Sequence, residues 1–318
     1  MARVLITGAA GFIGSHAAER FLQSGHQVVG IDNFDPFYPR QIKERNLSTL
    51  LGNAEFEFHE FDFTSEDFSI LNKVPFDLVV HLGAKAGVLP SLQRPQDYIR
   101  VNIEGTWRIL EFMRETDCKK LIFASSSSIY GNNPVPFEET ADVSNPISPY
   151  AFSKKSCELI NHTYHKLYNL DILNLRFFTV YGERQRPDLA IHKFVASILH
   201  GKEIQLYGNG ETSRDYTYVG DTVEGIYRAW EFLASGSGIF ENINLGNRNP
   251  VSLLEMVRTI EDVLGSKANV RYLPAQPGDV DCTFASIEKA ERMLSYNPTT
   301  RFREGVARFV NWYKSTMV

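Results

Sequence analysis

The chain alternates between short apolar runs and longer segments with helical periodicity. Apolar runs of strand length are separated by segments whose apolar residues fall on one side of a helix. In the first half the predicted strands are 3–7, 27–31, 56–61, 76–82, 121–124 and 171–178, and the clearest predicted helices are 16–23, 95–115 and 149–168. This alternation predicts an α/β fold with a Rossmann-like, doubly wound parallel sheet.

The pattern changes after residue 179. A charged loop at 183–188 leads into helices that short strands interrupt at 204–207, 240–245 and 270–273. We interpret residues 1–179 as a Rossmann domain and residues 180–318 as a smaller, discontinuous α/β substrate-binding lobe, with part of the later chain returning to the first domain. Because no flexible linker separates the two parts, we expect them to share a cleft.

Glycines follow the first predicted strand directly. Gly8, Gly11 and Gly14 lie between this strand and a helix, and Asp32 closes the next strand. In a dinucleotide-binding βαβ unit, glycines let the backbone approach the pyrophosphate and the helix N-terminus offers free N–H groups. The spacing is GxxGxxG rather than GxGxxG, and a tight turn alone would also explain the glycines. With strand, helix and acid in order, the segment predicts NAD binding, because Asp32 suits a ribose hydroxyl and repels the 2′-phosphate of NADP.

The ends of the next strands extend this prediction. Asp62 follows the third strand, where it could bond the adenine amino group, and small residues follow the fourth strand at 83–87. Small residues there leave room for a ligand, although a simple turn would look the same. The predicted cofactor contacts of these segments are Gly8, Gly11, Phe12, Ile13, Gly14, Asp32, Asn33, Asp62, Phe63, Leu82, Ala84 and Lys85.

A possible proton-handling set follows the fifth strand. This strand runs into the serines Ser125–Ser128, and Ser148-Pro149 is a helix start that places Tyr150 and Lys154 four residues apart on one helix face. A lysine ammonium and an oxidised nicotinamide favour phenolate and would lower the tyrosine pKa from about 10. Tyr150 could then take a proton from a substrate alcohol, with Ser126 or Ser127 bonding the same oxygen. An ordinary amphipathic helix surface and a solvated serine loop are the structural alternatives.

Composition excludes several classes of protein. The 318 residues carry a net charge of −5, which gives no reason to expect nucleic acid as a partner. Three widely spaced cysteines predict no disulfide framework or metal site and favour a reducing cytoplasm. No apolar segment approaches the roughly 20 residues of a membrane span, so we expect no membrane association. The first strand runs straight into glycines, which does not resemble a signal peptide.

Taken together, these motifs resemble the extended branch of the short-chain dehydrogenase/reductase superfamily, and within it the nucleotide-sugar 4-epimerases. The resemblance runs over essentially the whole length and includes residues 7–14, Asp32, Asp62, 125–131, Tyr150 with Lys154, 176–182 and 213–219. It implies Tyr150 as base, Lys154 on the nicotinamide ribose, Ser126 on the reacting hydroxyl, and Phe177 at the cofactor. It also implies a homodimer through helices 95–115 and 149–168.

The resemblance further implies a UDP-sugar substrate. Arg214 would hold the diphosphate and Asp279 would lie near the nucleotide. The full set of predicted substrate contacts is Ser127, Ser128, Thr179, Arg186, Gln205, Tyr207, Arg214 and Asp279. For arginines such as these, a solvated surface role is an even alternative.

The subclass is indicated by two segments. Where dehydratases and decarboxylases of the family carry an acid, this chain has Ser126–Ser128, which favours simple epimerisation, and residues 176–190 look like those of the UDP-glucuronate 4-epimerases. Two departures are Leu89, where those enzymes usually have an arginine, and Ala285-Ser286 in place of Ala-Asp. A UDP-glucose/UDP-galactose or N-acetylhexosamine 4-epimerase therefore stays open, as does a catalytically silent NAD-binding protein.

Overall fold

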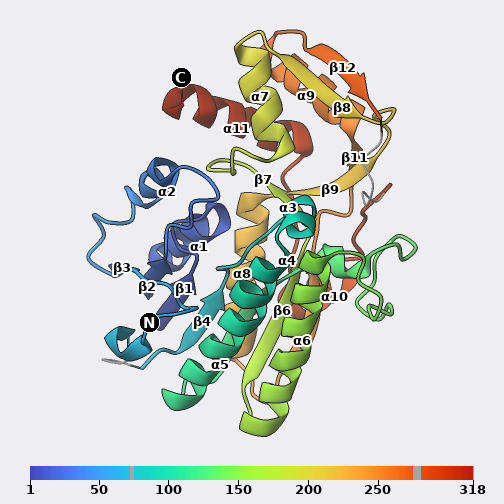
Figure 1. The fold of residues 1–318 in the computed structure, drawn as a ribbon. Helices are drawn as coiled ribbons and strands as arrows, with labels where there is room; N and C mark the ends of the chain where they lie inside the picture. The colour runs from blue at the N-terminus through green and yellow to red at the C-terminus, as the bar shows by residue number, and fades with distance from the viewer. Residues whose placement is uncertain (72–74, 275–280, 318) are drawn as a thin grey trace.

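A seven-stranded parallel sheet forms the centre of the molecule (Figure 1). The structure, a computed structural model, describes residues 1–71, 75–274 and 281–317. The sheet has the order β10-β6-β5-β4-β1-β2-β3 and comprises β1 (Arg3–Thr7), β2 (Gln27–Asp32), β3 (Phe56–Glu60), β4 (Leu78–His81), β5 (Lys120–Ser126), β6 (Asp171–Phe177) and β10 (Phe240–Leu245). The predicted doubly wound fold is confirmed. The strand order reverses between β1 and β4, where a ligand crevice is expected in such sheets.

Both faces of the sheet are buried, which explains why its strands are nearly continuously apolar. In β1, Val4 and Ile6 join the core under α1 and α8, whereas Leu5 joins the core under α5 and α6. The helices of this part are α1 (Phe12–Gln23), α2 (Arg40–Leu47), α3 (Val88–Gln93), α4 (Pro95–Tyr98), α5 (Gly105–Glu115), α6 (Pro149–Tyr168), α8 (Val219–Ala234) and α10 (Glu288–Leu294), with short turns η1 (Phe68–Leu71) and η3 (Ser127–Tyr130).

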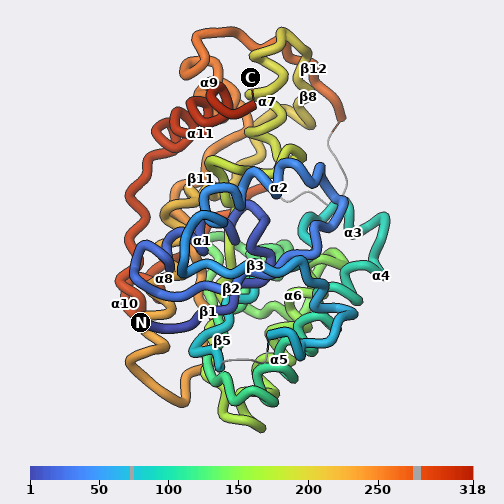
Figure 2. The backbone as a smooth tube through the Cα atoms, turned by 90° about the vertical axis from the view of Figure 1, so that its left-hand side faces the viewer, coloured from blue at the N-terminus to red at the C-terminus, as the bar shows by residue number. Residues whose placement is uncertain are grey.

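The remaining elements lie together at the opposite end of the molecule from the base of α5 and α6 (Figure 2). They are α7 (Ala190–Leu199), α9 (Leu253–Leu264), α11 (Phe302–Thr316), the sheet β11-β9-β7 of Pro250–Ser252, Ser213–Tyr218 and Thr179–Tyr181, and the parallel pair β12 and β8 of Asn269–Leu273 and Glu203–Tyr207. The chain passes repeatedly between the two ends, because β10 lies between these elements in sequence yet pairs with β6. The domain division at residue 180 stays a prediction.

Several element boundaries differ from those predicted. Helix α1 begins at Phe12, directly after the glycines, rather than at His16. The predicted helix 95–115 is divided, because a π-helical turn, η2 (Ile99–Glu104), separates α4 from α5. A π-turn is wider than an α-turn and is not encoded in hydrophobic periodicity. Strand β4 spans only Leu78–His81, and Phe76, which is also buried, precedes it.

No helix among the described residues is long and apolar enough to cross a bilayer. The three cysteines are free thiols; Cys118 and Cys157 are buried and Cys282 is partly exposed.

Candidate active site

A cavity of about 380 Å³ opens where the carboxyl ends of β1, β4 and β5 meet. The turn after β1 forms part of its wall. Gly8 has φ +70°, and a Cβ there would lie 2.9 Å from the Gly83 Cα. A Cβ on Gly14 would lie 2.1 Å from the Gly8 carbonyl oxygen. Both positions therefore require glycine, because any side chain would push apart the turn and the helix that follows it.

The start of α1 faces the same cavity. Its cap residue is Gly11, and within the described chain no side chain bonds to the first N–H groups of this helix. Its first turn also carries no acidic residue. Uncapped N–H groups and the positive end of the helix dipole suit a phosphate group. A close-packed glycine turn beside such a helix start fits the pyrophosphate of a dinucleotide.

Asp32 lies at the cavity end of β2 and is buried. Its Oδ1 accepts hydrogen bonds from the Phe34 N–H (2.8 Å) and from Lys43 Nζ (3.2 Å). Lys43 itself is buried on α2. Asp32 therefore lies in the cavity, and its role as a cofactor contact stays a prediction. The ion pair was not predicted, because no spacing rule links a strand-end acid to a lysine on the following helix.

Asp62 and Phe63, which follow β3, also line the cavity. Asp62 accepts hydrogen bonds from the Thr64 N–H and Oγ1 and from Asn33 Nδ2. Burial alone would raise the pKa of Asp62, but these hydrogen bonds outweigh it and lower the pKa. The carboxylate is therefore held ionised and oriented, which suits an acceptor for an amino group.

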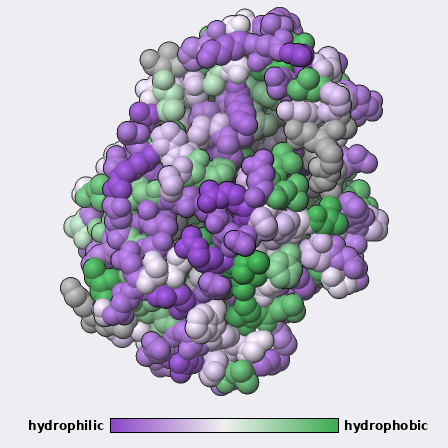
Figure 3. All heavy atoms as spheres, in the orientation of Figure 1, coloured by the Kyte–Doolittle hydropathy of each residue, from purple (hydrophilic) through white to green (hydrophobic). Residues whose placement is uncertain are grey.

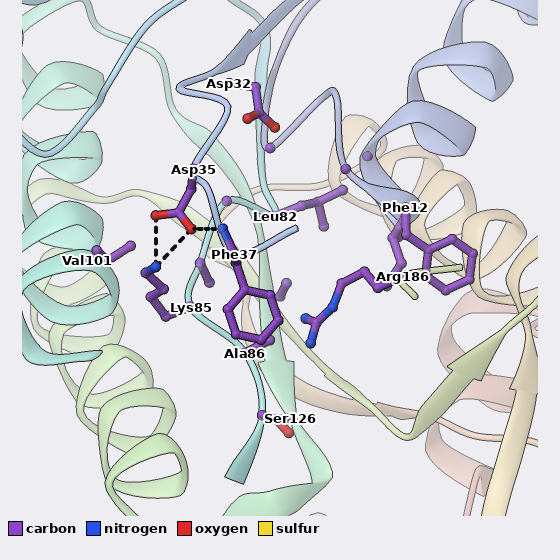
Figure 4. A pocket seen from close by; sticks show the side chains of 18 of the residues that line it. Phe12, Asp32, Asp35, Phe37, Leu82, Lys85, Ala86, Val101, Ser126 and Arg186 are labelled. Carbon is purple, nitrogen blue, oxygen red and sulfur yellow. Dashed lines mark hydrogen bonds and ion pairs between the residues drawn. The ribbon is translucent and has the colours of Figure 1, made fainter. Parts of the chain in front are cut away.

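The loop after β2 crosses the cavity (Figure 4). Asp35 pairs with Lys85 (2.8 Å), and the Phe37 N–H donates to Asp35 Oδ1 (3.1 Å). The Phe37 ring lies between Lys85 and Arg186, whose guanidinium carbon is 4.9 Å from the ring centroid. This loop therefore links the β4 side of the cavity to the loop after β7. Sequence analysis missed Asp35 and Phe37, because a loop has no periodicity that shows which side chains face inward.

Tyr150 and Lys154 both line the cavity from α6. The helix starts as predicted: Pro149 is its first residue and Ser148 Oγ accepts the Ala151 N–H (3.1 Å). Lys154 Nζ donates to the Ala124 carbonyl oxygen (2.7 Å), which fixes the ammonium against the end of β5. Ser126 lies in that strand end and also lines the cavity. The structure thus brings the three predicted catalytic side chains together.

The electrostatics of this set differ in part from expectation. Burial raises the pKa of Tyr150, whereas the Ser126 hydroxyl and the Arg186 charge act in the lowering direction. Burial lowers the pKa of Lys154 to about 8, opposed by Cys157 and Glu158. The predicted lowering of the tyrosine pKa includes the charge of an oxidised nicotinamide. The protein alone leaves burial as the larger effect, so the buried phenol needs that added positive charge to ionise near neutral pH.

His81 lies at the end of β4. It is buried, but Thr7 Oγ1 lies 2.7 Å from Nδ1 and Thr106 Oγ1 lies 3.2 Å from Nε2. Burial lowers its pKa to about 3, with a further contribution from Lys154. His81 is therefore a neutral, hydrogen-bonded core residue.

Asn102, in the π-turn, was missed altogether. Its side-chain amide accepts the Lys85 N–H (2.8 Å) and donates to the Lys85 carbonyl oxygen (3.0 Å) and to Ser153 Oγ (2.9 Å). It thus ties the loop after β4 to α6. An asparagine in a predicted amphipathic helix gives no signal of such a role.

The predicted cofactor residues and the predicted substrate residues lie in different surroundings. Every predicted cofactor residue, Phe177 included, lines the cavity. Of the predicted substrate residues, Thr179 and Arg186 do so, with Arg186 bonded to Asp188 through Nε (2.9 Å) and Nη2 (2.6 Å). The other residues of the cavity lining, which were not named as cofactor or substrate contacts, are Asp35, Phe37, Tyr38, Lys43, Thr64, Gly83, Ala86, Gly87, Arg100, Val101, Ala124, Ser125, Phe178, Val180 and Leu189.

Five other predicted substrate residues lie outside the cavity lining. Ser127 and Ser128 begin η3, and Gln205 and Tyr207 lie on the exposed face of β8. Arg214 is half-buried on β9 and donates to the Ser213 carbonyl oxygen (2.8 Å). Asp279 lies outside the described residues. The roles of these residues stay predictions.

Within the described chain there is no cluster of three or more histidine, cysteine or acidic side chains that could hold a metal ion.

Comparisons with known proteins agree with this site. Residues 4–246 match the model of the NAD dependent epimerase/dehydratase family. A UDP-glucuronate 4-epimerase of Thermodesulfobacterium geofontis is 39% identical over 320 residues, covering 100% of this chain and 98% of that protein. The crystal structure of a Bacillus cereus UDP-glucuronic acid 4-epimerase, in complex with UDP-glucuronic acid and NAD, superposes with a TM-score of 0.93 at 36% identity and covers 98% of this chain and 99% of that one.

A second solved structure has a different named substrate. A UDP-N-acetylglucosamine 4-epimerase of Methanobrevibacter ruminantium, in complex with UDP-N-acetylmuramic acid, superposes with a TM-score of 0.90 at 32% identity and covers 99% of both chains.

Proposed function

The chain belongs to the NAD-dependent epimerase/dehydratase family, and from this premise we propose that it interconverts UDP-glucuronate and UDP-galacturonate. Its reaction class is NAD-dependent 4-epimerisation of a UDP-sugar, the class of the relatives that match nearly its whole length. The proposal depends most on one observation: Tyr150, Lys154 and Ser126 share a single cavity with the glycine turn of β1.

The sheet side of the cavity would hold NAD. Gly8, Gly14 and the start of α1 fit the pyrophosphate, and Asp32 fits a ribose hydroxyl. When bound, NAD supplies the acceptor and then the donor for the hydrogen at C4 of the sugar, through a transient 4-keto sugar.

Tyr150 would move the proton at O4 of the sugar. Its phenol faces the cavity, and Ser126 lies close enough to affect its pKa, so the serine hydroxyl can share the reacting oxygen. Lys154, anchored on the Ala124 carbonyl, supplies positive charge beside this pair and is placed for the nicotinamide ribose. The same tyrosine would return the proton after the keto sugar has turned over.

The carboxylate of a uronate imposes a further requirement. A 4-keto uronate is a β-keto acid, which loses its carboxylate unless that group is held. The carboxylate would be held in its ionised form by hydrogen bonds from the hydroxyls of Ser127, Ser128 and Thr179 and from Arg186. In the described chain, the Ser128 hydroxyl oxygen is buried and lacks a hydrogen-bond partner, which suits a group that receives a ligand.

Leu89 favours a second candidate, 4-epimerisation of a neutral UDP-sugar. It is 47% exposed on α3, shortly after Ala86 and Gly87 of the cavity wall. An exposed leucine cannot neutralise a carboxylate, whereas the arginine expected in the uronate enzymes can. UDP-glucose, UDP-galactose or their N-acetyl forms would then be the substrates.

The two candidates can be tested by an NMR time course. The protein is incubated with UDP-glucuronate and, separately, with UDP-glucose, and no reductant is added. We expect a new C4 epimer from the uronate. Turnover of the neutral sugar alone would overturn the uronate assignment and identify Leu89 as the reason. A protein that binds NAD but converts no UDP-sugar would contradict the enzymatic proposal.

We also propose a homodimer through α4–α5 and α6. Exposed apolar side chains lie on these helices, and hydrophobic residues gather on that part of the surface in Figure 3. They are Ile99, Trp107, Phe152, Leu159 and Leu167. Such a set is typical of a partner surface. Sedimentation of wild type and Leu159→Glu tests it: a monomeric wild type would contradict the dimer.

The proposed compartment is the cytoplasm. Its support is that all three cysteines are free thiols. Fractionation of the native cells would test it.

A further inference from the structure

A fully buried ion pair lies directly behind the proposed catalytic set. Arg176, on β6, is 1% exposed, and Glu158, on α6, is 3% exposed. Arg176 Nε and Nη2 each lie 2.9 Å from a different carboxylate oxygen of Glu158. Two parallel hydrogen bonds of this kind fix the relative orientation of both groups, and burial keeps both charges away from water.

The pair connects the segments that carry the catalytic side chains. Glu158 lies one helical turn after Lys154 on α6. Its Oε1 also accepts the hydroxyl of Ser125 (2.7 Å), the residue beside Ser126 on β5. Arg176 pairs in register with Ser125 across β5 and β6. Helix α6 is therefore bonded to the serine end of β5 rather than merely packed against it.

The network continues toward η3 and β10. Arg176 Nη1 lies 2.8 Å from the Tyr130 hydroxyl, which donates to Asn244 Oδ1 (2.7 Å). Tyr130 closes the turn that begins with Ser127 and Ser128. Burial raises the pKa of Tyr130 to about 12, which keeps the phenol protonated as a donor.

Glu158 is also a negative charge close to Lys154. The groups facing Lys154 are Cys157 and Glu158 on α6, Tyr150 one turn earlier, His81 on β4, and the Phe123 ring on β5 at 4.9 Å from Nζ. His81 is neutral and burial raises the pKa of the Cys157 thiol. Glu158, whose Oε2 also lies 3.7 Å from Lys155 Nζ, is thus the one carboxylate among these described neighbours.

From this arrangement we propose that Glu158, held by Arg176 and Ser125, is a positioning residue for the epimerase reaction: it sets α6 against the end of β5 and keeps Lys154 in its ammonium form. This inference rests on the proposed function for its reaction. A purely structural ion pair would stabilise the fold without affecting the ionisation of the site.

The test compares four variants. Glu158→Gln removes the charge but keeps an oxygen for Ser125. Because it leaves Arg176 buried and unpaired, Glu158→Gln/Arg176→Gln provides a charge-balanced version. Ser125→Ala removes only the bond to the strand end. Asp171→Asn is the control: it changes a buried carboxylate on β6 that accepts the Ile239 N–H (2.8 Å) and is not part of the cavity lining.

The first readout is the pH dependence of kcat. Loss of the Glu158 charge should move the alkaline limb to lower pH by about one unit, because a neighbouring anion favours the ammonium form. Ser125→Ala should lower kcat by about threefold or more without moving the limb, since one hydrogen bond is lost and no charge. Asp171→Asn should keep the wild-type pH profile even if it is less stable.

The second readout needs no sugar. The phenolate absorbance of Tyr150 is titrated in the NAD-loaded protein, with Tyr150→Phe subtracted, and should require higher pH in the Glu158 variants. A shifted titration in a protein that turns over no UDP-sugar would refute the proposed function and leave this inference standing. An unshifted titration and pH profile in folded Glu158 variants would overturn the inference. If both Glu158 variants fail to fold, an unchanged kcat in Ser125→Ala would overturn it.

Discussion

The two sides of the cavity are built by different means. On the sheet side, the turn at Gly8, the start of α1 and the strand-end acid Asp32 follow one another within a single βαβ unit. On the other side, Thr179 lies in β7 and Arg186 in the loop that follows it, and β7 pairs with β9 much later in the chain. The first side is fixed by local backbone geometry, and the second by pairing between distant segments. We therefore expect substitutions on the sheet side to abolish the reaction. Substitutions on the side with Thr179 and Arg186 should instead change which sugar reacts.

The largest expected effect is that of Tyr150→Phe. Removing the phenol oxygen leaves no group to take the O4 proton, so kcat should fall by about 10³-fold or more. NAD content, measured after denaturation, should stay at the wild-type level, because the phenylalanine ring fills the space of the tyrosine ring. Turnover near the wild-type rate would refute the role of Tyr150.

Gly14→Ala tests how rigid the sheet side is. The new Cβ would lie 2.1 Å from the Gly8 carbonyl oxygen, so turn and helix must separate. Overpacking of this kind costs about 1–3 kcal/mol, and NAD binding should weaken with it. Gly52→Ala, with no atom within 4 Å of its Cβ, is the matched control and should leave thermal unfolding and NAD binding unchanged. Equal behaviour of the two variants would contradict the close-packed turn.

Arg186→Gln tests the opposite side. Losing the guanidinium should raise KM for UDP-glucuronate by about 10- to 100-fold, because a charged hydrogen bond is lost. The KM for UDP-glucose, if it is turned over, should change much less. Asp188→Asn frees Arg186 from its ion pair without removing it and provides the comparison. An equal loss with both sugars would show that Arg186 does not distinguish between them.

The last expected effect is that of pH, which acts through Lys154. The ammonium form of Lys154 is the active one, and burial lowers its pKa to about 8. The charged fraction, and with it kcat, should therefore be full below this pH and fall by about tenfold for each unit above it. Measuring kcat from pH 6 to 10 at saturating sugar tests the sign. A plateau extending to pH 10 would mean that Lys154 stays charged throughout.

Much of the sheet side could be read from the sequence, because its signals are local. Strand β1, the glycines and Asp32 appear in the order that the fold requires, and Ser148-Pro149 marks the start of α6 where it occurs. The approach of Tyr150 and Lys154 to Ser126 followed from a helix placed beside a strand end.

The site contacts that the sequence did not predict depend on contacts between distant segments. Lys43 reaches Asp32 from another element, and Asp35 meets Lys85 across the cavity. The π-turn that directs Asn102 toward Lys85 leaves no trace in hydrophobic periodicity. No rule of spacing predicts such pairs, because each one depends on how two separately formed elements pack.

The late position of β10 in the sequence affects how the sheet folds during synthesis. This strand covers the outer edge of β6, yet it is made only after α7, β8, β9 and α8. Until residues 240–245 leave the ribosome, β6 presents an open row of backbone donors and acceptors, and such an edge recruits other strands. A chain shortened before β10 would therefore contain every residue of the proposed proton relay, and we expect it to aggregate rather than to act as a smaller enzyme.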